Sequence, residues 1–331
     1  MPTTPAPHLP LGTWPTPVEP APRLAEHLGL GPDDLLLKRD DLSGLGGGGN
    51  KVRKLERTVG RALAEGADVL VTTGAGQSNH ARATAAAARR AGLGCVLVLV
   101  GSAPERPAGN LVLDELLGAR VEWAGDVDSA GLDAAADAVV ERLRGEGARP
   151  SRIPYGGSDA LGVLGYVDAA AEVAAQVPDA AHVVTAVGSG GTMAGLVAGL
   201  GAGRVLGVDV GAVPDPVERV VGLLRGVAAA FGDHLPDGAA AALAGVGPDH
   251  LRLPRDEVGD GYGLPTRAST AALSAAALTE GVVLDPVYTA KALAGLASAV
   301  RRGEVRPGER TVLVHTGGLP GLFGHRSVTG V

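Results

Sequence analysis

Short runs of apolar, mainly β-branched residues alternate with alanine-rich stretches along most of the chain. Runs that are apolar throughout are typical of strands buried on both faces, and helical segments between such strands indicate parallel sheets. The pattern therefore predicts an α/β fold built from mostly parallel open sheets flanked by helices. The predicted strands span residues 69–74, 95–101, 182–188, 204–211 and 311–318.

Proline is frequent between residues 2 and 22, which predicts an extended arm that packs on a domain surface. The 331 residues, of which 45% are hydrophobic, suffice for a large core divided between two domains. Stretches rich in glycine or proline mark candidate boundaries and surface loops at residues 101–110, 154–159, 211–218 and 231–238.

Charge and composition narrow the class of partner. The net charge of -7, without a block of basic residues, argues against nucleic acid and anionic membranes as partners. No basic residue precedes Arg23, and no apolar run approaches the roughly 18 residues of a membrane helix, so neither a signal peptide nor a membrane span is predicted. The single Cys95 lies in the apolar run CVLVLV, where a buried thiol is expected. A cytoplasmic protein without an intramolecular disulfide is the expectation.

Two of only four lysines follow a glycine-rich loop in GLGGGGNKVRKLE, residues 44–56. Asn50 is a suitable N-cap, which places Lys51 in the first turn of a helix. The positive end of the helix dipole should lower the pKa of Lys51 and favour its use as a nucleophile. Arginine cannot serve as an amine nucleophile, so a lysine kept in an arginine-rich chain suggests that its nitrogen is needed. Spacing alone also fits two solvated surface lysines, Lys51 and Lys54.

The stretch TTGAGQSNHAR passes from a strand to an alanine-rich helix that begins near Ser78 or Asn79. Ligands bind at such carboxyl ends of strands in open α/β sheets, and amides at a helix start suit an anion. Ser78 also fits a purely structural N-cap. His80 has no metal-ligand partner at a suitable spacing, so packing or hydrogen bonding is the expected role.

The stretch HVVTAVGSGGTMAGL predicts an anion site most specifically. Its glycines and hydroxyls bridge a buried strand and a small-residue helix, which supplies free amides for a phosphate. It contains no GK[ST] and fails GxGxxG, so neither a Walker loop nor a dinucleotide fingerprint is present. A turn that needs glycine only for its geometry is the alternative. The residues concerned are Gly188, Ser189, Gly190, Gly191 and Thr192.

Tyr262 and Tyr288, two of the four tyrosines, stand in polar stretches marked by glycine or proline, and Thr316 follows a strand. Each tyrosine can instead close a domain edge. A lysine nucleophile, a phosphate-binding turn and hydroxyls at strand ends together are the groups that pyridoxal 5′-phosphate requires.

In order along the chain, several stretches resemble the D-cysteine desulfhydrase and 1-aminocyclopropane-1-carboxylate deaminase family. The resemblance runs from about Pro15 to Phe323. It implies pyridoxal-phosphate fold type II, with the cofactor in a cleft between a large domain of residues 1–51 and 161–331 and a small domain of residues 52–160. It also implies a homodimer. The matching stretches are GGGGNKVRKLE, GAGQSNHAR, PYGGSDALGVLGY, GSGGTMAGL, GYGLPT, DPVYTAKA and HTGGLPGLFG.

The resemblance also assigns roles around the cofactor. Lys51 would bind pyridoxal phosphate covalently, whereas Lys54 would be the second lysine of the motif. Asn79 would contact the phenolic oxygen of the cofactor, the turn at 188–192 its phosphate, and Thr316 its pyridine nitrogen. No metal is implied.

The catalytic residues implied by the resemblance are Lys51, Ser78, Tyr262 and Tyr288. Ser78, Asn79, His80, Tyr262 and Tyr288 would surround a small amino-acid substrate.

The expected reaction is β-elimination from D-cysteine, which yields pyruvate, hydrogen sulfide and ammonia. His80, Thr289 and Thr316 resemble the desulfhydrases, since ring-opening deaminases have glutamine, glutamate and leucine at the matching positions. Asp159, where relatives often have asparagine, is a departure. The sequence leaves open L-cysteate sulfo-lyase activity, another β-substituted alanine, β-replacement and racemisation. A phosphate-binding regulatory protein without covalent chemistry is the alternative from another class.

Overall fold

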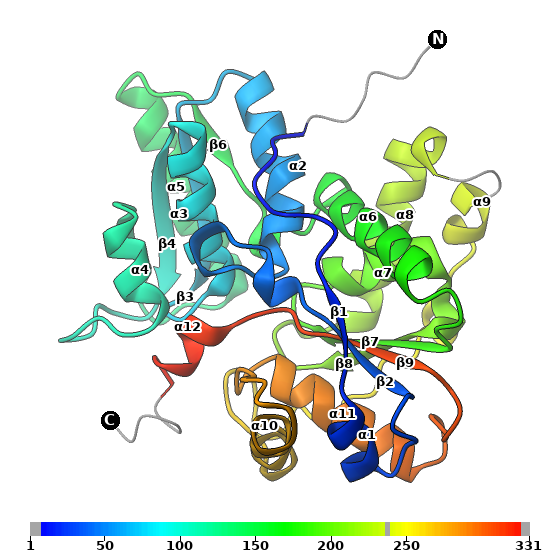
Figure 1. Ribbon diagram of the computed structural model, residues 1–331. Coiled ribbons are helices and arrows are strands. Elements are labelled where there is room, and N and C mark those ends of the chain that lie inside the picture. The colour runs from blue at the N-terminus through cyan, green and yellow to red at the C-terminus, as the bar shows by residue number, and fades with distance from the viewer. Residues whose placement is uncertain (1–7, 236–238, 326–331) are drawn as a thin grey trace.

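A computed structural model describes residues 8–235 and 239–325 as two sheets with helices around them (Figure 1). The larger sheet has five strands, and the smaller has four. All pairings are parallel except that of β1 with β2. In spatial order, the larger sheet contains β1 (Val18–Pro20), β2 (Leu35–Lys38), β9 (Thr311–Val314), β7 (His182–Val187) and β8 (Val205–Asp209). The smaller contains β5 (Arg120–Trp123), β4 (Gly94–Val100), β3 (Val69–Ala75) and β6 (Pro150–Arg152).

Helices connect the strands and cover the sheets. The α-helices are α1 (Pro22–Leu28), α2 (Lys51–Ala64), α3 (Asn79–Ala91), α4 (Asn110–Leu116), α5 (Ser129–Gly145), α6 (Ala160–Gln176), α7 (Gly191–Leu200), α8 (Pro216–Phe231), α9 (Ala239–Ala244), α10 (Arg267–Glu280), α11 (Thr289–Arg301) and α12 (Leu319–Leu322). Short 3-10 turns include η1 (Asp40–Leu42), η2 (Leu45–Gly47) and η3 (Tyr155–Gly157).

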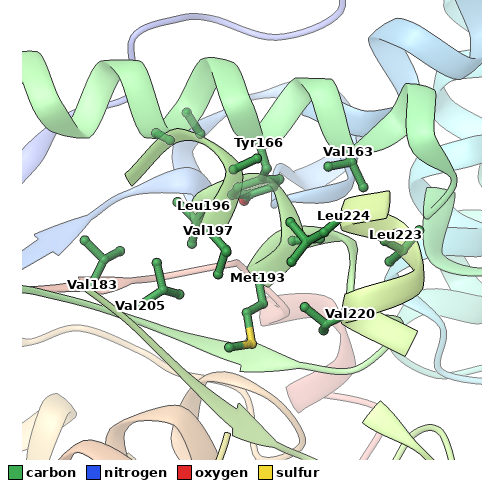
Figure 2. Close-up of a cluster of buried hydrophobic side chains, with 14 of the residues drawn as sticks. Val163, Tyr166, Val183, Met193, Leu196, Val197, Val205, Val220, Leu223 and Leu224 are labelled. Carbon is green, nitrogen blue, oxygen red and sulfur yellow. The ribbon is translucent and has the colours of Figure 1, made fainter. Parts of the chain in front are cut away.

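Alternating side chains of the larger sheet enter two separate hydrophobic layers. Val183 and Val187 of β7 pack toward α6, α7 and α8, whereas Val184 and Ala186 pack toward α1, α10 and α11. Figure 2 shows the first layer, in which Met193 of α7 lies against the sheet. Burial on both faces explains why these strands are apolar throughout.

The smaller sheet is covered in the same way. Leu97 and Leu99 of β4 pack with α2 and α3, and Val96 and Val98 pack with α5. Cys95 of this strand is buried, as predicted, and burial raises the pKa of its thiol to about 12.

The fold class and the five predicted strands are confirmed. Sequence reasoning did not predict β1, β2, β5 and β6, which have only three or four residues each. The domain boundaries after residues 51 and 160 stay a prediction. Residues 1–7 of the predicted arm and residues 236–238 of the stretch 231–238 lie outside the described part. Among the described residues, no helix is both long and apolar enough to cross a membrane.

Candidate active site

Two cavities lie where the carboxyl ends of β3, β7 and β9 meet the starts of α2, α3 and α7. They adjoin, because Lys51, Ser189 and Tyr288 line both. All the predicted site residues except Gly191 line one or both of them. The first is lined by Asn50, Lys51, Asn79, Ala186, Gly188, Ser189, Gly190, Thr192, Tyr288 and Thr316. The second is lined by Lys51, Ala75, Ser78, His80, Tyr155, Gly156, Ser189, Tyr262 and Tyr288.

Lys51 is the first residue of α2 and faces both cavities. Burial lowers the pKa of its amine to about 8; nearby Asp285 opposes this shift, and Arg82 adds to it. Sequence reasoning expected a lowered pKa from the helix dipole; the direction of the shift agrees, and its main cause is loss of hydration on burial. Within residues 8–235 and 239–325, no hydrogen bond or ion pair is recorded for this nitrogen. The amine is therefore available to a ligand in the cavity.

The side chain of Asn50 does not cap α2, which corrects the expectation from sequence. Its Nδ2 instead donates to Thr192 Oγ1 at 3.0 Å, and its backbone N donates to Thr316 O at 3.0 Å. Asn50 therefore joins the start of α2 to the glycine turn before α7 and to the strand end after β9. These contacts hold the two walls of the first cavity next to Lys51.

The glycine turn after β7 leaves the start of α7 open to an anion. Gly190 precedes the helix with φ +84°, and no side chain of the described residues caps the amides at the helix start. Gly191, which does not line the cavity, is packed behind it, since a Cβ there would lie 2.4 Å from Ser158 Oγ and 2.9 Å from Lys54 Nζ. Uncapped amides at a helix start are the groups that bind phosphate.

Lys54 supports this turn from behind. Its amine donates to Ser158 Oγ at 3.0 Å, and Ser158 Oγ lies 2.8 Å from Ser189 Oγ. The residue is only 1% exposed, so a solvated surface lysine was the wrong interpretation. Burial, and next the positive charge of Lys51, keep the pKa of Lys54 well below its usual value.

The start of α3 supplies Ser78 and Asn79. Ser78 is the N-cap, and its Oγ accepts a hydrogen bond from Ala81 N at 3.1 Å. Ser78 therefore caps α3 and also lines the second cavity. His80 is buried, its Nε2 lies 2.9 Å from Thr72 Oγ1, and its Nδ1 has no partner among the described residues. Burial, followed by the nearby lysines, lowers the pKa of His80 well below its usual value, which keeps the ring neutral.

Three tyrosines meet at the second cavity. The hydroxyls of Tyr262 and Tyr288 are hydrogen-bonded, with ring centroids 6.1 Å apart. Burial raises the pKa of each, so both hydroxyls keep their protons. Sequence reasoning missed Tyr155, which lies beside Tyr262. Its position in PYGGSD, another glycine-marked stretch, was the available signal.

A carboxylate holds Tyr288 in place. Asp285 Oδ2 accepts hydrogen bonds from the backbone N of Val287 and of Tyr288, at 3.0 and 2.9 Å. Its Oδ1 accepts from Thr289 N at 2.8 Å and from Thr289 Oγ1 at 2.6 Å. Asp285 thereby anchors the start of α11, and Thr289 faces this cap rather than the cavities.

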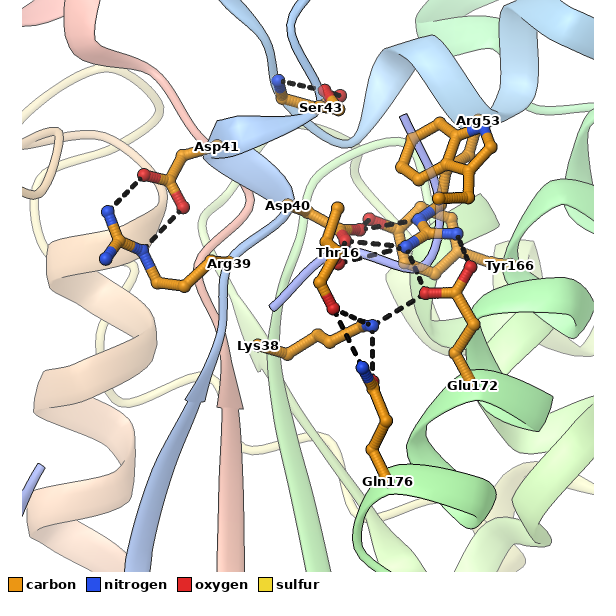
Figure 3. Close-up of polar contacts among 12 residues, drawn as sticks. Thr16, Lys38, Arg39, Asp40, Asp41, Ser43, Arg53, Tyr166, Glu172 and Gln176 are labelled. Carbon is orange, nitrogen blue, oxygen red and sulfur yellow. Dashed lines mark hydrogen bonds and ion pairs between the residues drawn. The ribbon is translucent and has the colours of Figure 1, made fainter. Parts of the chain in front are cut away.

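A buried ionic cluster surrounds Arg53 of α2 (Figure 3). Arg53 donates to Asp40 Oδ1 at 2.8 Å and to both carboxylate oxygens of Glu172, at 2.8 Å each. The Arg53 guanidinium stacks 3.9 Å from the centre of the Trp14 ring. Lys38 donates to Glu172 Oε2 at 2.6 Å. The cluster joins α2 to the N-terminal arm, to η1 and to α6.

Comparison with known proteins identifies the family of this chain. Residues 9–317 match the model of a family described as pyridoxal-phosphate dependent enzyme. The chain belongs to this family. This pyridoxal-phosphate enzyme is 41% identical to a D-cysteine desulfhydrase of Klebsiella pneumoniae, over 96% of each chain. It is 40% identical to a Pyrococcus horikoshii protein provisionally named as a 1-aminocyclopropane-1-carboxylate deaminase, over 96% of this chain and 93% of that one.

A solved structure of a homologue of 1-aminocyclopropane-1-carboxylate deaminase is similar to the whole enzyme. The TM-score is 0.85 at 37% identity, over 97% of this chain and 94% of that one. The enzyme is thus a pyridoxal-phosphate-dependent lyase of fold type II, in the family that contains D-cysteine desulfhydrases and 1-aminocyclopropane-1-carboxylate deaminases.

The residues at the cavities fit the cofactor of this family. The buried Lys51 amine, which has no hydrogen-bond or ion-pair partner among the described residues, opens on the same cavity as the amides at the start of α7. An aldehyde requires the first group, and a phosphate requires the second.

Proposed function

We propose that this lyase eliminates the β substituent of D-cysteine and, with one molecule of water, gives pyruvate, hydrogen sulfide and ammonia. The observation that carries the proposal is the Lys51 amine, with its pKa of about 8, beside an anion-binding helix start and a group of tyrosine hydroxyls. The 41% identical D-cysteine desulfhydrase supports the choice of substrate.

Lys51 would hold pyridoxal phosphate covalently, and the turn of Gly188, Ser189, Gly190, Gly191 and Thr192 would hold its phosphate. Asn79 would contact its phenolic oxygen, and Thr316 its pyridine nitrogen. When bound, the cofactor supplies an electron sink for negative charge on the substrate Cα. A threonine hydroxyl does not donate a full proton to the pyridine, which favours prompt loss of a β leaving group.

The Lys51 amine would take the Cα proton. An amine with a pKa of about 8 is partly unprotonated near neutral pH, as a general base requires. Ser78, Asn79 and His80 would surround the substrate from the start of α3.

The hydroxyls of Tyr262 and Tyr288 would position the departing sulfur from the opposite wall. A thiol has a free pKa of about 8.5, so its thiolate departs with little acid assistance.

The cavity walls favour elimination over opening of the cyclopropane ring. Neither set of lining residues contains a carboxylate among the described residues, and Thr289 is engaged with Asp285. L-cysteate and other β-substituted alanines remain alternative substrates, and we distinguish them by experiment.

The test is a substrate panel assayed for pyruvate and 2-oxobutyrate. It contains D-cysteine, L-cysteine, β-chloro-D-alanine, L-cysteate and 1-aminocyclopropane-1-carboxylate. We expect pyruvate and sulfide from D-cysteine with the highest kcat/KM, and no product from Lys51→Ala. Formation of 2-oxobutyrate from the cyclopropane substrate as the main activity would contradict the proposal. A new amino acid would indicate β-replacement, and inverted substrate would indicate racemisation.

We also propose a cytoplasmic homodimer. Large apolar side chains lie exposed on the single chain, among them Leu116 at 79%, Leu278 at 80% and Phe323 at 62%. Exposed apolar side chains of this size gain stability when a second copy covers them.

A further inference from the structure

Asn110, the first residue of α4, is completely buried and makes four hydrogen bonds. Its backbone N donates to Gln77 Oε1 at 2.9 Å, and its Nδ2 donates to Gln77 O at 3.0 Å. The same Nδ2 donates to Asn79 Oδ1 at 2.9 Å. Arg82 Nε donates to Asn110 Oδ1 at 3.1 Å.

These partners allow only one orientation of the Asn110 amide. A guanidinium can only donate, so the atom that faces Arg82 is the oxygen of Asn110. A backbone carbonyl can only accept, so the atom that faces Gln77 O is the nitrogen of Asn110. The orientation therefore follows from partners whose hydrogen-bonding roles cannot be exchanged.

The orientation of Asn110 determines that of Asn79. Asn79 must turn its oxygen toward the Asn110 nitrogen, because two facing NH₂ groups would leave a buried contact without an acceptor. The Asn79 Nδ2 then points elsewhere, and it donates to none of the described residues. Since Asn79 lines the cavity that contains Lys51 and Thr316, its NH₂ group is available to that cavity.

Arg82 extends the same network to the loop before α2. Its Nη1 donates to Gly48 O at 3.0 Å and also to Gly46 O. Arg82 is 1% exposed, so these bonds are made away from water. Gly109 permits the close approach of the segment before Asn110, since a Cβ at its φ of +57° would lie 2.4 Å from Gln77 Oε1.

We infer that Asn110 is a positioning residue that makes Asn79 present N–H rather than C=O to the phenolic oxygen of the cofactor. The inference rests on the proposed function, in which Asn79 contacts that oxygen. Asn110 itself does not line either cavity and touches no substrate.

Asn110→Asp tests the inference at nearly unchanged shape. An oxygen now replaces the Asn110 nitrogen, so the Asn79 amide should rotate and offer its carbonyl to the cofactor. An N–H donor stabilises a negative phenolic oxygen, so its loss favours proton uptake there. We expect the visible absorbance of the bound cofactor to titrate about one pH unit higher than in the wild type. Affinity of the apo-protein for pyridoxal phosphate should fall about tenfold.

Four further variants separate positioning from general damage. Val112→Asp adds the same charge at an exposed position of α4 and should leave the titration unchanged. Asn79→Ala should shift it upward, and Asn110→Asp added to Asn79→Ala should cause no further shift. Asn110→Ala removes the contact without adding charge and should shift the titration in the same direction. This variant replaces Asn110→Asp in the test if Asn110→Asp does not fold.

The inference would be overturned if the Asn110 variants titrate like the wild type while Asn79→Ala is shifted. A further shift in the double variant would overturn it too, because Asn110 would then act independently of Asn79. If Asn79→Ala shifts nothing, the inference fails together with the assignment of Asn79 to the cofactor. Turnover of D-cysteine is assayed separately, so failure of the substrate proposal remains distinguishable.

Discussion

Lys51 and Lys54 lie three residues apart on α2, yet their surroundings assign them different tasks. Lys51 faces the cavity without a recorded partner among the described residues, whereas Lys54 donates to Ser158 Oγ and Gly156 O. The pKa of each is lowered, chiefly by burial. A low pKa therefore does not distinguish the two lysines, and the proposal that Lys51 is the nucleophile rests on its direction into the cavity.

The lowered pKa of Lys51 predicts how the cofactor attaches. In the apo-protein only the unprotonated amine reacts, so the attachment rate should rise with pH around a midpoint of about 8. The measurement is the change in absorbance after apo-protein is mixed with pyridoxal phosphate across a pH series. A midpoint near 10.5, the value of a free lysine, would show that burial does not activate this amine.

Asp114 predicts a pH dependence of stability. Neither carboxylate oxygen has a partner among the described residues, and burial raises the pKa to about 7 from 3.8. Between these values the native state keeps a proton that the unfolded chain has lost, so stability falls as pH rises. Asp114→Asn removes this loss. The free energy of unfolding of Asp114→Asn minus that of wild type, measured in urea, should increase by about 3 kcal/mol between about pH 5 and about pH 8.

A constant difference between Asp114→Asn and wild type across that range would contradict the raised pKa.

The sequence predicted the site residues that follow strands, but it did not predict the contacts between distant segments. Ser78, Thr316 and the glycine turn follow strands, and the carboxyl ends of parallel strands share one edge, so pattern alone brings them together. The Asn50–Thr192 bond and the position of Tyr155 depend on contacts between distant segments. Such contacts leave no periodic signal.

Helix α2 carries the proposed nucleophile, Lys51, and also groups that attach the helix to its surroundings. Lys51 faces the cavities, Arg53 enters the ionic cluster, and Lys54 supports the glycine turn. Glu56 Oε1 accepts from Leu11 N at 2.8 Å and from the Trp14 indole at 2.9 Å, which ties the N-terminal arm to the helix. The motif NKVRKLE therefore contains one cavity-lining lysine and three residues that attach the helix to other segments.

The buried cluster around Arg53 should determine the stability of this helix. Arg53→Leu would leave the Asp40 carboxylate, which is completely buried, without its cation. We expect a loss of about 3–5 kcal/mol in the free energy of unfolding, measured by urea denaturation. Arg57→Ala, also on α2, is the matched control. It removes a partly exposed ion pair to Asp168 of α6 and should cost less than about 1 kcal/mol. Equal losses in both variants would refute the role of burial.

At the element scale, sequence pattern predicted the described strands of five or more residues and also β9, but it missed the other strands of three or four residues. β3, β4 and β7 have six or seven residues, which are mostly apolar, and this makes them recognisable. β5 and β6 have four and three residues and contain charged side chains. Pairing with a neighbouring strand, rather than their own composition, makes these segments extended.

At the scale of the whole molecule, the active site belongs to neither sheet alone. The smaller sheet contributes the start of α3, and the larger contributes the turn after β7 and the end of β9. The sequence indicated that these segments meet, because each of the three motifs follows a different predicted strand. The separation into domains at residues 51 and 160 stays a prediction.

The predicted homodimer is tested by light scattering coupled to size-exclusion chromatography. We expect a mass twice the 32.9 kDa of the chain, because a second copy can cover the exposed apolar side chains. Leu278→Lys, at one of the most exposed leucines, and Leu116→Lys would identify which surface is covered. A monomer at all concentrations would contradict the prediction.

Identification of the lysine that carries the cofactor tests the account most directly. The holoenzyme is treated with borohydride, digested and analysed by peptide mass spectrometry. We predict that the phosphopyridoxyl group lies on Lys51 and is absent from Lys54 and from the Lys51→Ala variant. A label on Lys54, or no labelled lysine in a protein that has bound the cofactor, would contradict the account.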